Sequence, residues 1–152
     1  MQLVIPTITQ QIPAARPLVP VEAAMVLLDR DEDEILHAVE TGSLGWAWNI
    51  ATPGAARMEL RIWRESIQAL SSAQVDEPIE ADAVIARILP PTDLRSPQVQ
   101  RIFSCSSTHI HALIDAGTFE VVIPPASETG PRSFSVLSRD SVARFLRSRR
   151  VF

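Results

Sequence analysis

The sequence of 152 residues contains no lysine, no tyrosine and a single cysteine. One cysteine excludes an internal disulfide and fits a reducing compartment, so we expect a cytoplasmic protein. No apolar run approaches the roughly 20 residues that a membrane-spanning helix needs. The N-terminus lacks the basic region and the apolar core of a signal peptide. These absences predict a protein with no membrane partner.

Motifs for catalysis are also missing. There is no Ser/His/Asp set, no phosphate-binding loop and no cluster of carboxylates in an apolar frame. Cys105, His109 and His111 have the spacing C-x₃-H-x-H, but a zinc site needs a fourth ligand and usually better-spaced pairs. We therefore expect no enzymatic activity, no cofactor and no metal.

Charge is divided unevenly along the chain. Residues 20–72 hold four arginines against nine acidic residues, a net charge of −5, whereas residues 94–152 hold eight arginines against four, a net charge of +4. Such asymmetry suggests that one half meets a polyanion and the other does not. Every basic side chain other than histidine is arginine, which binds phosphate and guanine bidentately.

Residues 21–71 and 96–146 have the pattern of one structural unit written twice, 75 positions apart and without a gap. Gly42 aligns with Gly117, and the apolar positions align around them. Two pairs of arginines also align, Arg57 with Arg132 and Arg64 with Arg139. A unit of about 50 residues is near the lower limit for a stable core. We therefore expect the two copies to pack on each other or on a second chain.

Apolar periodicity and turn residues predict the same order of elements in both copies: helix, turn, helix, β-hairpin, helix. In the second copy, Ser96-Pro97 begins the first helix, Ser104-Cys105-Ser106 separates it from the second, and Gly117 ends the second. Its apolar stripes are Val99/Ile102/Phe103, Ile110/Leu113/Ile114 and Val142/Phe145/Leu146, its strands 119–123 and 132–137 enclose a loop at 124–131, and Ser138 caps the last helix.

The first copy has equivalent stripes at equivalent offsets. They are Ala24/Leu27/Leu28, Ile35/Ala38/Val39 and Ile67/Leu70, and its strands 46–50 and 58–62 enclose a loop at 51–56. Residues 80–89 have helical composition and are stopped by Pro90-Pro91. The predicted organisation is an extended N-terminal arm (1–19), which has a short strand near Leu3-Val4-Ile5 or is disordered, an acidic copy (20–72), a linker with a short helix (73–95) and a basic copy (96–152).

Residues 99–103, 104–117 and 137–146 combine a small-polar turn, an apolar pair before a glycine, and a closing R-x-S-V-x-x-F-L segment. They resemble the winged helix-turn-helix of the excisionase and MerR-like DNA-binding family. The resemblance covers most of 96–147 and, more weakly, 21–71. It implies an α+β fold of two tandem winged helix-turn-helix domains, mainly helical. In such proteins the second helix enters the major groove and the wing touches the neighbouring backbone or minor groove. The second helix of this chain lacks the usual arginine or lysine.

Duplex DNA is therefore the expected partner of the second copy. Hydroxyl and imidazole groups can bond phosphates or base edges, and a helix N-terminus attracts phosphate. The candidate DNA-binding residues are Arg101, Ser106, Ser107, Thr108, His109, His111, Arg132, Arg139, Arg144, Arg147, Arg149 and Arg150. If six arginines reach phosphates, the logarithm of the binding constant falls with the logarithm of the salt concentration with a slope near about −5.

The first copy carries acidic residues where the second helix begins. Asp31, Glu32, Asp33 and Glu34 stabilise a helix N-terminus through the dipole and repel phosphate. We predict that this copy does not read DNA and is instead a dimerisation unit, a partner-binding module, an imitation of DNA charge or a plain solvated face. Trp46, Trp48 and Trp63 either fill its core or mark a contact between copies or with a partner. The four acidic residues, Trp46 and Trp48 are the candidate partner-binding set.

The resulting hypothesis is a DNA-binding transcriptional regulator or an excisionase-like recombination accessory factor of a mobile element or phage. The alternative is an adaptor or anti-activator that binds another protein through the acidic copy and needs no DNA. A module of about 50 residues with few base-reading groups gains affinity by pairing half-sites or lining up along DNA. We therefore expect a homodimer.

Overall fold

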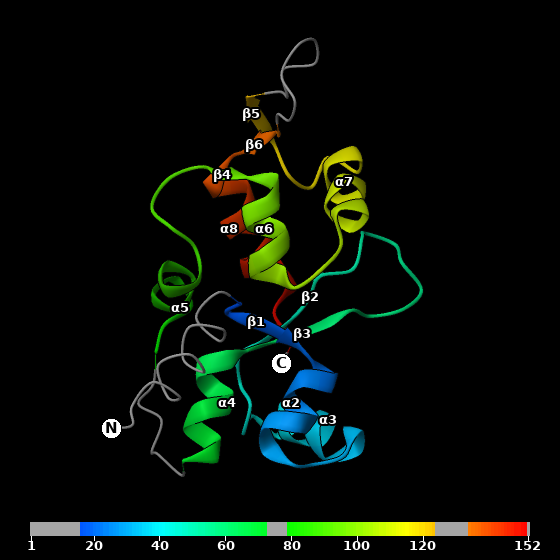
Figure 1. The fold of residues 1–152 in the computed structure, drawn as a ribbon, viewed down its shortest axis with the longest axis vertical. Helices are drawn as coiled ribbons and strands as arrows, with labels where there is room; N and C mark the ends of the chain where they lie inside the picture. The colour runs from blue at the N-terminus through cyan, green and yellow to red at the C-terminus, as the bar shows by residue number, and fades with distance from the viewer. Residues whose placement is uncertain (1–15, 73–78, 124–133, 152) are drawn as a thin grey trace, which may run out of the picture.

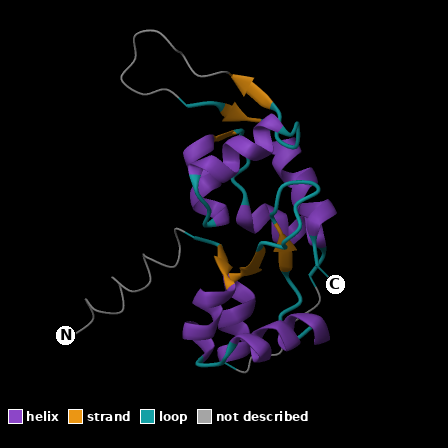
Figure 2. Ribbon diagram, turned by 90° about the vertical axis from the view of Figure 1, so that its right-hand side faces the viewer, coloured by secondary structure: helices purple, strands orange, loops and turns teal. Residues whose placement is uncertain are grey.

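The computed structural model describes residues 16–72, 79–123 and 134–151. These residues form a mixed α+β fold of seven helices and two three-stranded antiparallel sheets, which confirms the expected fold class at that level (Figure 1). Two units follow one another along the long axis. We call residues 18–71 the first unit and residues 94–149 the second unit. Figure 2 shows the resulting layers: helices, a sheet, helices again and a second small sheet.

The first unit is built around a sheet with the strand order β1-β3-β2. Its elements are β1 (Leu18–Pro20), α2 (Val21–Leu28), α3 (Glu32–Thr41), β2 (Ala47–Asn49), β3 (Leu60–Trp63) and α4 (Arg64–Ser71). Leu18 lies opposite Trp63, and Ala47 lies opposite Ile62. The central strand β3 therefore joins the N-terminal strand to the hairpin.

The second unit has the corresponding strand order, β4-β6-β5. Its elements are β4 (Leu94–Arg95), α6 (Ser96–Phe103), α7 (Ser107–Asp115), β5 (Val121–Ile123), β6 (Val136–Leu137) and α8 (Arg139–Arg149). Between the units lies α5 (Ala81–Ile88), which confirms the helix expected before Pro90-Pro91. The register of β5 against β6 shifts between Val121 and Ile123.

Local details recur 75 residues apart as well. Asp29 and Ser104 both adopt the left-handed backbone conformation, with φ of 53° and 51°. Gly42 and Gly117 also have positive φ, 88° and 78°, as expected for glycines that end a helix. In each unit a buried serine two residues into the last helix donates a hydrogen bond to a backbone carbonyl: Ser66 to Trp63 at 2.7 Å and Ser141 to Ser138 at 2.8 Å.

Side-chain caps explain where several helices begin. Asp31 accepts a hydrogen bond from the Glu34 backbone N–H at 2.9 Å, and Glu34 accepts one from the Asp31 N–H at 3.2 Å, a capping box. Ser106 and Ser138 cap α7 and α8, as the sequence predicts. The start of α6 differs by one residue: Ser96 is already helical and Arg95 is the N-cap. A difference of one residue at a helix end is common, and proline is accepted in the first turn of a helix, where Pro97 lies.

One hydrophobic core spans both units. Leu18, Trp48, Ile50 and Trp63 from the first unit pack in the same cluster as residues of α5 and of the second unit. The second unit contributes three phenylalanine rings, Phe103, Phe119 and Phe145, whose centroids lie 5.2 to 6.0 Å apart. A second cluster lies within the first unit and includes Val151 at its edge. Of the two alternatives expected from the sequence, packing of the segments on each other or on a second chain, the structure shows the first.

Four sequence expectations need correction or lie outside the described residues. Leu18 and Val19 belong to β1 and are buried, so the sheet begins inside the segment assigned to an arm. Leu27 is 40% exposed because the buried side of α2 follows Val21 and Ala24 (i, i+3) rather than the predicted stripe. The proposed strand near residues 3–5 and the loop at 124–131 lie outside the described residues. None of the helices that the structure describes is long and apolar enough to cross a membrane.

Candidate nucleic-acid interface

Helix α7 has one buried side and one side open to solvent. Ile110 and Leu113 are buried in the shared core. Ser107, Thr108 and His111 are exposed on the opposite side. The Ser106 hydroxyl accepts a hydrogen bond from the His109 backbone N–H at 3.2 Å, which fixes the first turn. The exposed side thus presents two hydroxyls and an imidazole at the start of a helix.

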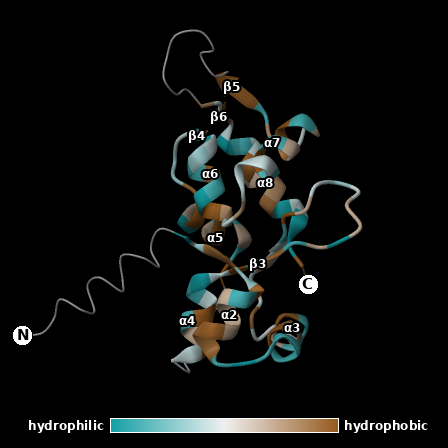
Figure 3. Ribbon diagram, turned by 45° about the vertical axis from the view of Figure 1, so that its right-hand side comes forward, coloured by the Kyte–Doolittle hydropathy of each residue, from teal (hydrophilic) through white to brown (hydrophobic). Residues whose placement is uncertain are grey.

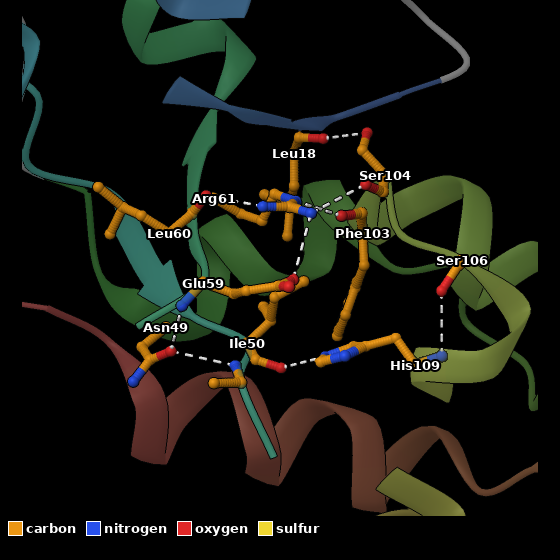
Figure 4. A network of polar contacts seen from close by, with 11 residues as sticks. Leu18, Asn49, Ile50, Glu59, Leu60, Arg61, Phe103, Ser104, Ser106 and His109 are labelled. Atoms are coloured by element: carbon orange, nitrogen blue, oxygen red, sulfur yellow. Dashed lines mark hydrogen bonds and ion pairs between the residues drawn. The ribbon is translucent and has the colours of Figure 1, made fainter. Parts of the chain in front are cut away.

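His109 occupies a different position from the one expected of a DNA contact. Its side chain is half-buried, and Nε2 lies 2.6 Å from the Ile50 carbonyl oxygen, to which it donates a hydrogen bond (Figure 4). Ile50 belongs to the first unit, just after β2. The structure therefore places His109 in the contact between the units, whereas Ser107, Thr108 and His111 remain accessible.

Arg61 fixes the α6–α7 turn against the first unit. From the centre of β3, its Nε donates to the Phe103 carbonyl at 2.8 Å and its Nη2 to the Ser104 carbonyl at 3.0 Å. The Ser104 hydroxyl in turn donates to the Leu18 carbonyl at 2.6 Å (Figure 4). Only 12% of the Arg61 side chain is exposed. A cation at a helix C-terminus complements the helix dipole, so Arg61 orients the turn that precedes α7.

Two hollows flank this turn. One, of about 200 Å³, is lined by Arg16, Pro97, Gln100, Arg101 and Cys105, and no acidic side chain of the described residues lines it. The other, of about 500 Å³, lies between α7 and the first unit, where Thr52 and Glu59 face Thr108 and His109. The first hollow brings two exposed arginines beside the residue that precedes the N-cap of α7.

Cys105 separates the two hollows. Burial raises the pKa of its thiol to about 11; the nearby Arg61 guanidinium lowers this pKa and Glu59 raises it, both to a smaller extent. The thiol is therefore neutral near pH 7, which does not suit a nucleophile or a metal ligand. The described residues contain no group of three His, Cys, Asp or Glu side chains that could hold a metal ion.

Three of the candidate arginines are engaged within the fold. Arg139 donates from Nε to the Pro90 carbonyl at 2.6 Å, and Arg149 donates to the carbonyls of Asn49 at 2.9 Å and Ala51 at 2.8 Å. Arg150 donates to the Gly45 carbonyl at 2.8 Å and lies over the Trp46 ring, 3.5 Å from its centroid. The contacts of Arg149 and Arg150 hold the end of the second unit and the C-terminus against the first unit, whereas Arg139 joins the start of α8 to the segment that follows α5.

The remaining arginines differ in availability. Arg147 forms an exposed ion pair with Asp82 at 2.9 Å. Arg101 and Arg144 are exposed and form no ion pair within the described residues. Arg132 lies outside the described part of the chain. The cations open to a ligand are thus fewer than the sequence suggests.

The acidic counterpart of this site begins α3. Asp31 and Glu34 form the capping box, while Glu32 and Asp33 are exposed in the first turn. Figure 3 shows the start of α3 and the preceding turn as strongly hydrophilic. All four carboxylates are exposed, so phosphate approaching this helix N-terminus meets repulsion.

Trp46 and Trp48 pack inside the fold and do not form an open binding surface. Trp48 is 1% exposed, so its assignment to a protein partner is replaced by a contact between the units. Trp46 is half-buried, stacks near Trp48 with centroids 6.2 Å apart and is covered by Arg150. Both residues therefore belong to the junction of the two units.

Three arginines near this site were not among the candidates. Arg61 and Arg16 stand in segments read as a strand and an arm, and Arg57 lies exposed in the β2–β3 loop. The alignment of Arg57 with Arg132 was the only signal for any of them. No protein-family model, curated protein or solved structure matches the chain, so the functional argument rests on its own geometry.

Proposed function

We propose that this chain is a non-enzymatic DNA-binding protein with two tandem winged helix-turn-helix units, of which the second contacts duplex DNA. Its role would be that of a transcriptional regulator or an excisionase-like recombination accessory factor. The observation that supports this most is the accessible side of α7. Ser107, Thr108 and His111 are exposed there, next to a turn whose flank carries Arg16 and Arg101.

The contrast between α7 and α3 supports the same proposal. The two helices begin at equivalent places, but α7 starts with neutral hydroxyl groups and α3 with four carboxylates. Phosphate binds at helix N-termini through backbone N–H groups and the dipole, and carboxylates at that place would repel it. The difference predicts that only the second unit receives the DNA backbone.

A loop of the first unit lies next to α7. Its β2–β3 loop extends beside α7 (Figure 1), and Thr52 from this loop lines the same hollow as Thr108. The loop carries the exposed Arg57. A duplex lying along α7 would thus meet a cation from the first unit as well. A homodimer that pairs two half-sites would add affinity that a single unit of this size lacks.

Salt dependence of DNA binding tests the proposal. With fluorescence anisotropy on a random 30-base-pair duplex, phosphate contacts from the four exposed arginines without an ion pair among the described residues near this site (Arg16, Arg57, Arg101 and Arg144) predict a log–log slope of roughly −3.6, from about −0.9 per contact. Replacing both Arg16 and Arg101 by alanine should flatten the slope by about two. The control is Arg30→Ala, which removes an exposed arginine from the equivalent turn of the first unit and should leave the slope unchanged.

The alternative function predicts a different result. If wild-type protein shows no binding to duplex DNA at low salt, the adaptor hypothesis stands and the DNA proposal fails. If Arg30→Ala weakens binding as much as the double variant, contact through the second unit is wrong. Loss that is equal for all duplex sequences would identify Arg16 and Arg101 as phosphate contacts rather than base contacts.

A further inference from the structure

The first unit contains a groove that the DNA proposal does not use. It runs between α2, α3 and the β2–β3 hairpin and has a volume of about 590 Å³. Val21, Leu36, Met58 and Leu60 supply apolar lining. Leu36 is 37% exposed and Met58 is 56% exposed. Large apolar side chains left open on a groove wall mark an interaction surface more often than isolated exposed ones do.

The rim of the groove is acidic. Glu22, Glu32 and Glu59 line it, from α2, α3 and the hairpin. Glu59 lies 3.5 Å from Arg61, whereas Glu22 and Glu32 form no ion pair with any described residue. Arg61 also lines the groove and offsets the charge of Glu59, so Glu22 and Glu32 supply the remaining negative charge of the rim.

A partner cannot easily extend the sheet beside the groove. Residues 150–151 already bond to the outer edge of β2, through the Val151 N–H and the Ala47 carbonyl at 2.9 Å. On β1, the Leu18 carbonyl accepts from Ser104 of the second unit. A helix that places apolar anchors from one face into a groove is a common mode that suits this apolar lining.

We propose that this groove binds a cationic amphipathic helix of another protein, with apolar anchors on Leu36 and Met58 and basic flanks facing Glu22 and Glu32. A second copy of this chain fits poorly. Among the described helices, the large apolar residues that are exposed are Val26, Leu27 and Leu36, all in the acidic first unit. No described helix of the chain therefore offers an exposed face that is both apolar and basic.

Peptide display on the folded, full-length protein tests this surface. A library of random 16-residue peptides is selected on wild-type protein and counter-selected on a variant carrying Leu36→Ala, Met58→Ala and Glu32→Lys. The peptides expected to be enriched carry apolar residues at helical spacing, flanked by arginine or lysine. Failure to enrich any peptide that distinguishes the two proteins overturns the proposal, and so does enrichment of acidic peptides.

Matched variants then locate the contact. Leu36→Ala with Met58→Ala should weaken the binding of a selected peptide at least tenfold, and Glu32→Lys at least threefold. The controls are Val26→Ala, 81% exposed and outside the groove, and Asp33→Lys, the exposed neighbour of Glu32. Both should stay within twofold of wild type. Equal losses in the controls, or concentration-dependent self-association that the groove variants abolish, would overturn the assignment. DNA affinity should be unchanged in Leu36→Ala with Met58→Ala, so this test fails or succeeds independently of DNA binding.

Discussion

Arg61 shows how a single side chain connects the two halves of this molecule. It is the one cation of β3, yet its guanidinium bonds to Phe103 and Ser104 about 40 positions further along the chain, at 2.8 and 3.0 Å. Hydrogen bonds to a charged group contribute more than neutral ones, and their loss leaves the carbonyls without a partner. Arg61 therefore belongs to the stability of the fold and to the orientation of α7 together.

Replacement of Arg61 by alanine should lower the free energy of unfolding by about 2 kcal/mol, from the usual range for charge-assisted hydrogen bonds. Urea denaturation followed by circular dichroism measures it. Arg87→Ala is the control, since its ion pair with Glu65 at 3.1 Å is exposed on both sides and should contribute less than about 0.5 kcal/mol. Similar losses in both variants would contradict the role assigned to Arg61.

Cys105 should govern how stability depends on alkaline pH. Burial raises the pKa of its thiol from 9.0 to about 11 in the folded protein, so the folded state favours the neutral form. The stabilisation is complete below pH 9 and is lost as pH rises through 11. The sequence has no lysine and no tyrosine, and the α-amino group titrates at about pH 8. Burial lowers the pKa of Arg64 and of Arg150 from its usual value, so a variant without the thiol is needed as the comparison.

The urea midpoint of wild-type protein should therefore fall between pH 9 and pH 11, the interval set by the two pKa values. In Cys105→Ser the midpoint should stay level across the same interval, whatever its absolute position. A parallel fall in the two proteins would show that another group controls stability there.

The roles of some individual residues could be predicted from the sequence, and those of others could not. The caps Ser106 and Ser138 were predictable, because a small polar residue before a helix acts within three residues of itself. Asp31 was placed at the start of its helix for its charge, and the structure adds its role as the cap. Arg149 could not be assigned in the same way, since its acceptors at Asn49 and Ala51 lie about 100 positions away. An arginine available for DNA and an arginine bound to a distant carbonyl look identical in a sequence.

Among the secondary-structure elements, the helices and the hairpin strands were predictable, and the first strand of each sheet was not. The stripe Ile35, Ala38, Val39 is buried as expected, because the i, i+3, i+4 spacing places three side chains on one helix face. The strands β1 and β4 have three and two residues, too few for any alternation to be recognised. Their pairing with β3 and β6 depends on tertiary contact alone.

The first turn of α7 allows capping to be separated from electrostatics. Asp and Asn cap a helix about as well as Ser, so Ser106→Asp and Ser106→Asn should both keep the free energy of unfolding within about 0.5 kcal/mol. A carboxylate about 4 Å from a phosphate costs about 1 kcal/mol in water, which corresponds to about fivefold weaker DNA binding for Ser106→Asp. Ser106→Asn serves as the control, with affinity near wild type.

Denaturation curves and anisotropy titrations on the same samples measure both quantities. Unchanged DNA affinity in Ser106→Asp would remove the N-terminus of α7 from the interface. A loss of stability in both variants would instead indicate that the Ser106 hydroxyl is held by more than its bond to the His109 N–H, which measures 3.2 Å.

For the molecule as a whole, the shared core decides how the two units behave. Trp48, Ile50 and Trp63 of the first unit lie in the same buried cluster as Phe103 and its neighbours in the second unit. A unit of about 50 residues is near the lower limit at which a single core is stable by itself. Separation of the units would expose both sides of this cluster to water, so neither half gains from unfolding alone.

Unfolding should therefore be a single cooperative transition. All three tryptophans, Trp46, Trp48 and Trp63, lie in the first unit, so their fluorescence reports that unit and the junction, whereas far-UV circular dichroism reports helices of both units. In urea the two signals should give the same midpoint and the same slope, the ordinary test of two-state behaviour.

In Trp48→Ala, a cost of roughly 3 to 5 kcal/mol is expected from the cavity left behind, and both midpoints should fall together. Midpoints that separate, with fluorescence changing first and part of the dichroism surviving, would mean that the second unit stands without the first and that the contacts of Arg61, His109 and Arg149 are secondary to its stability.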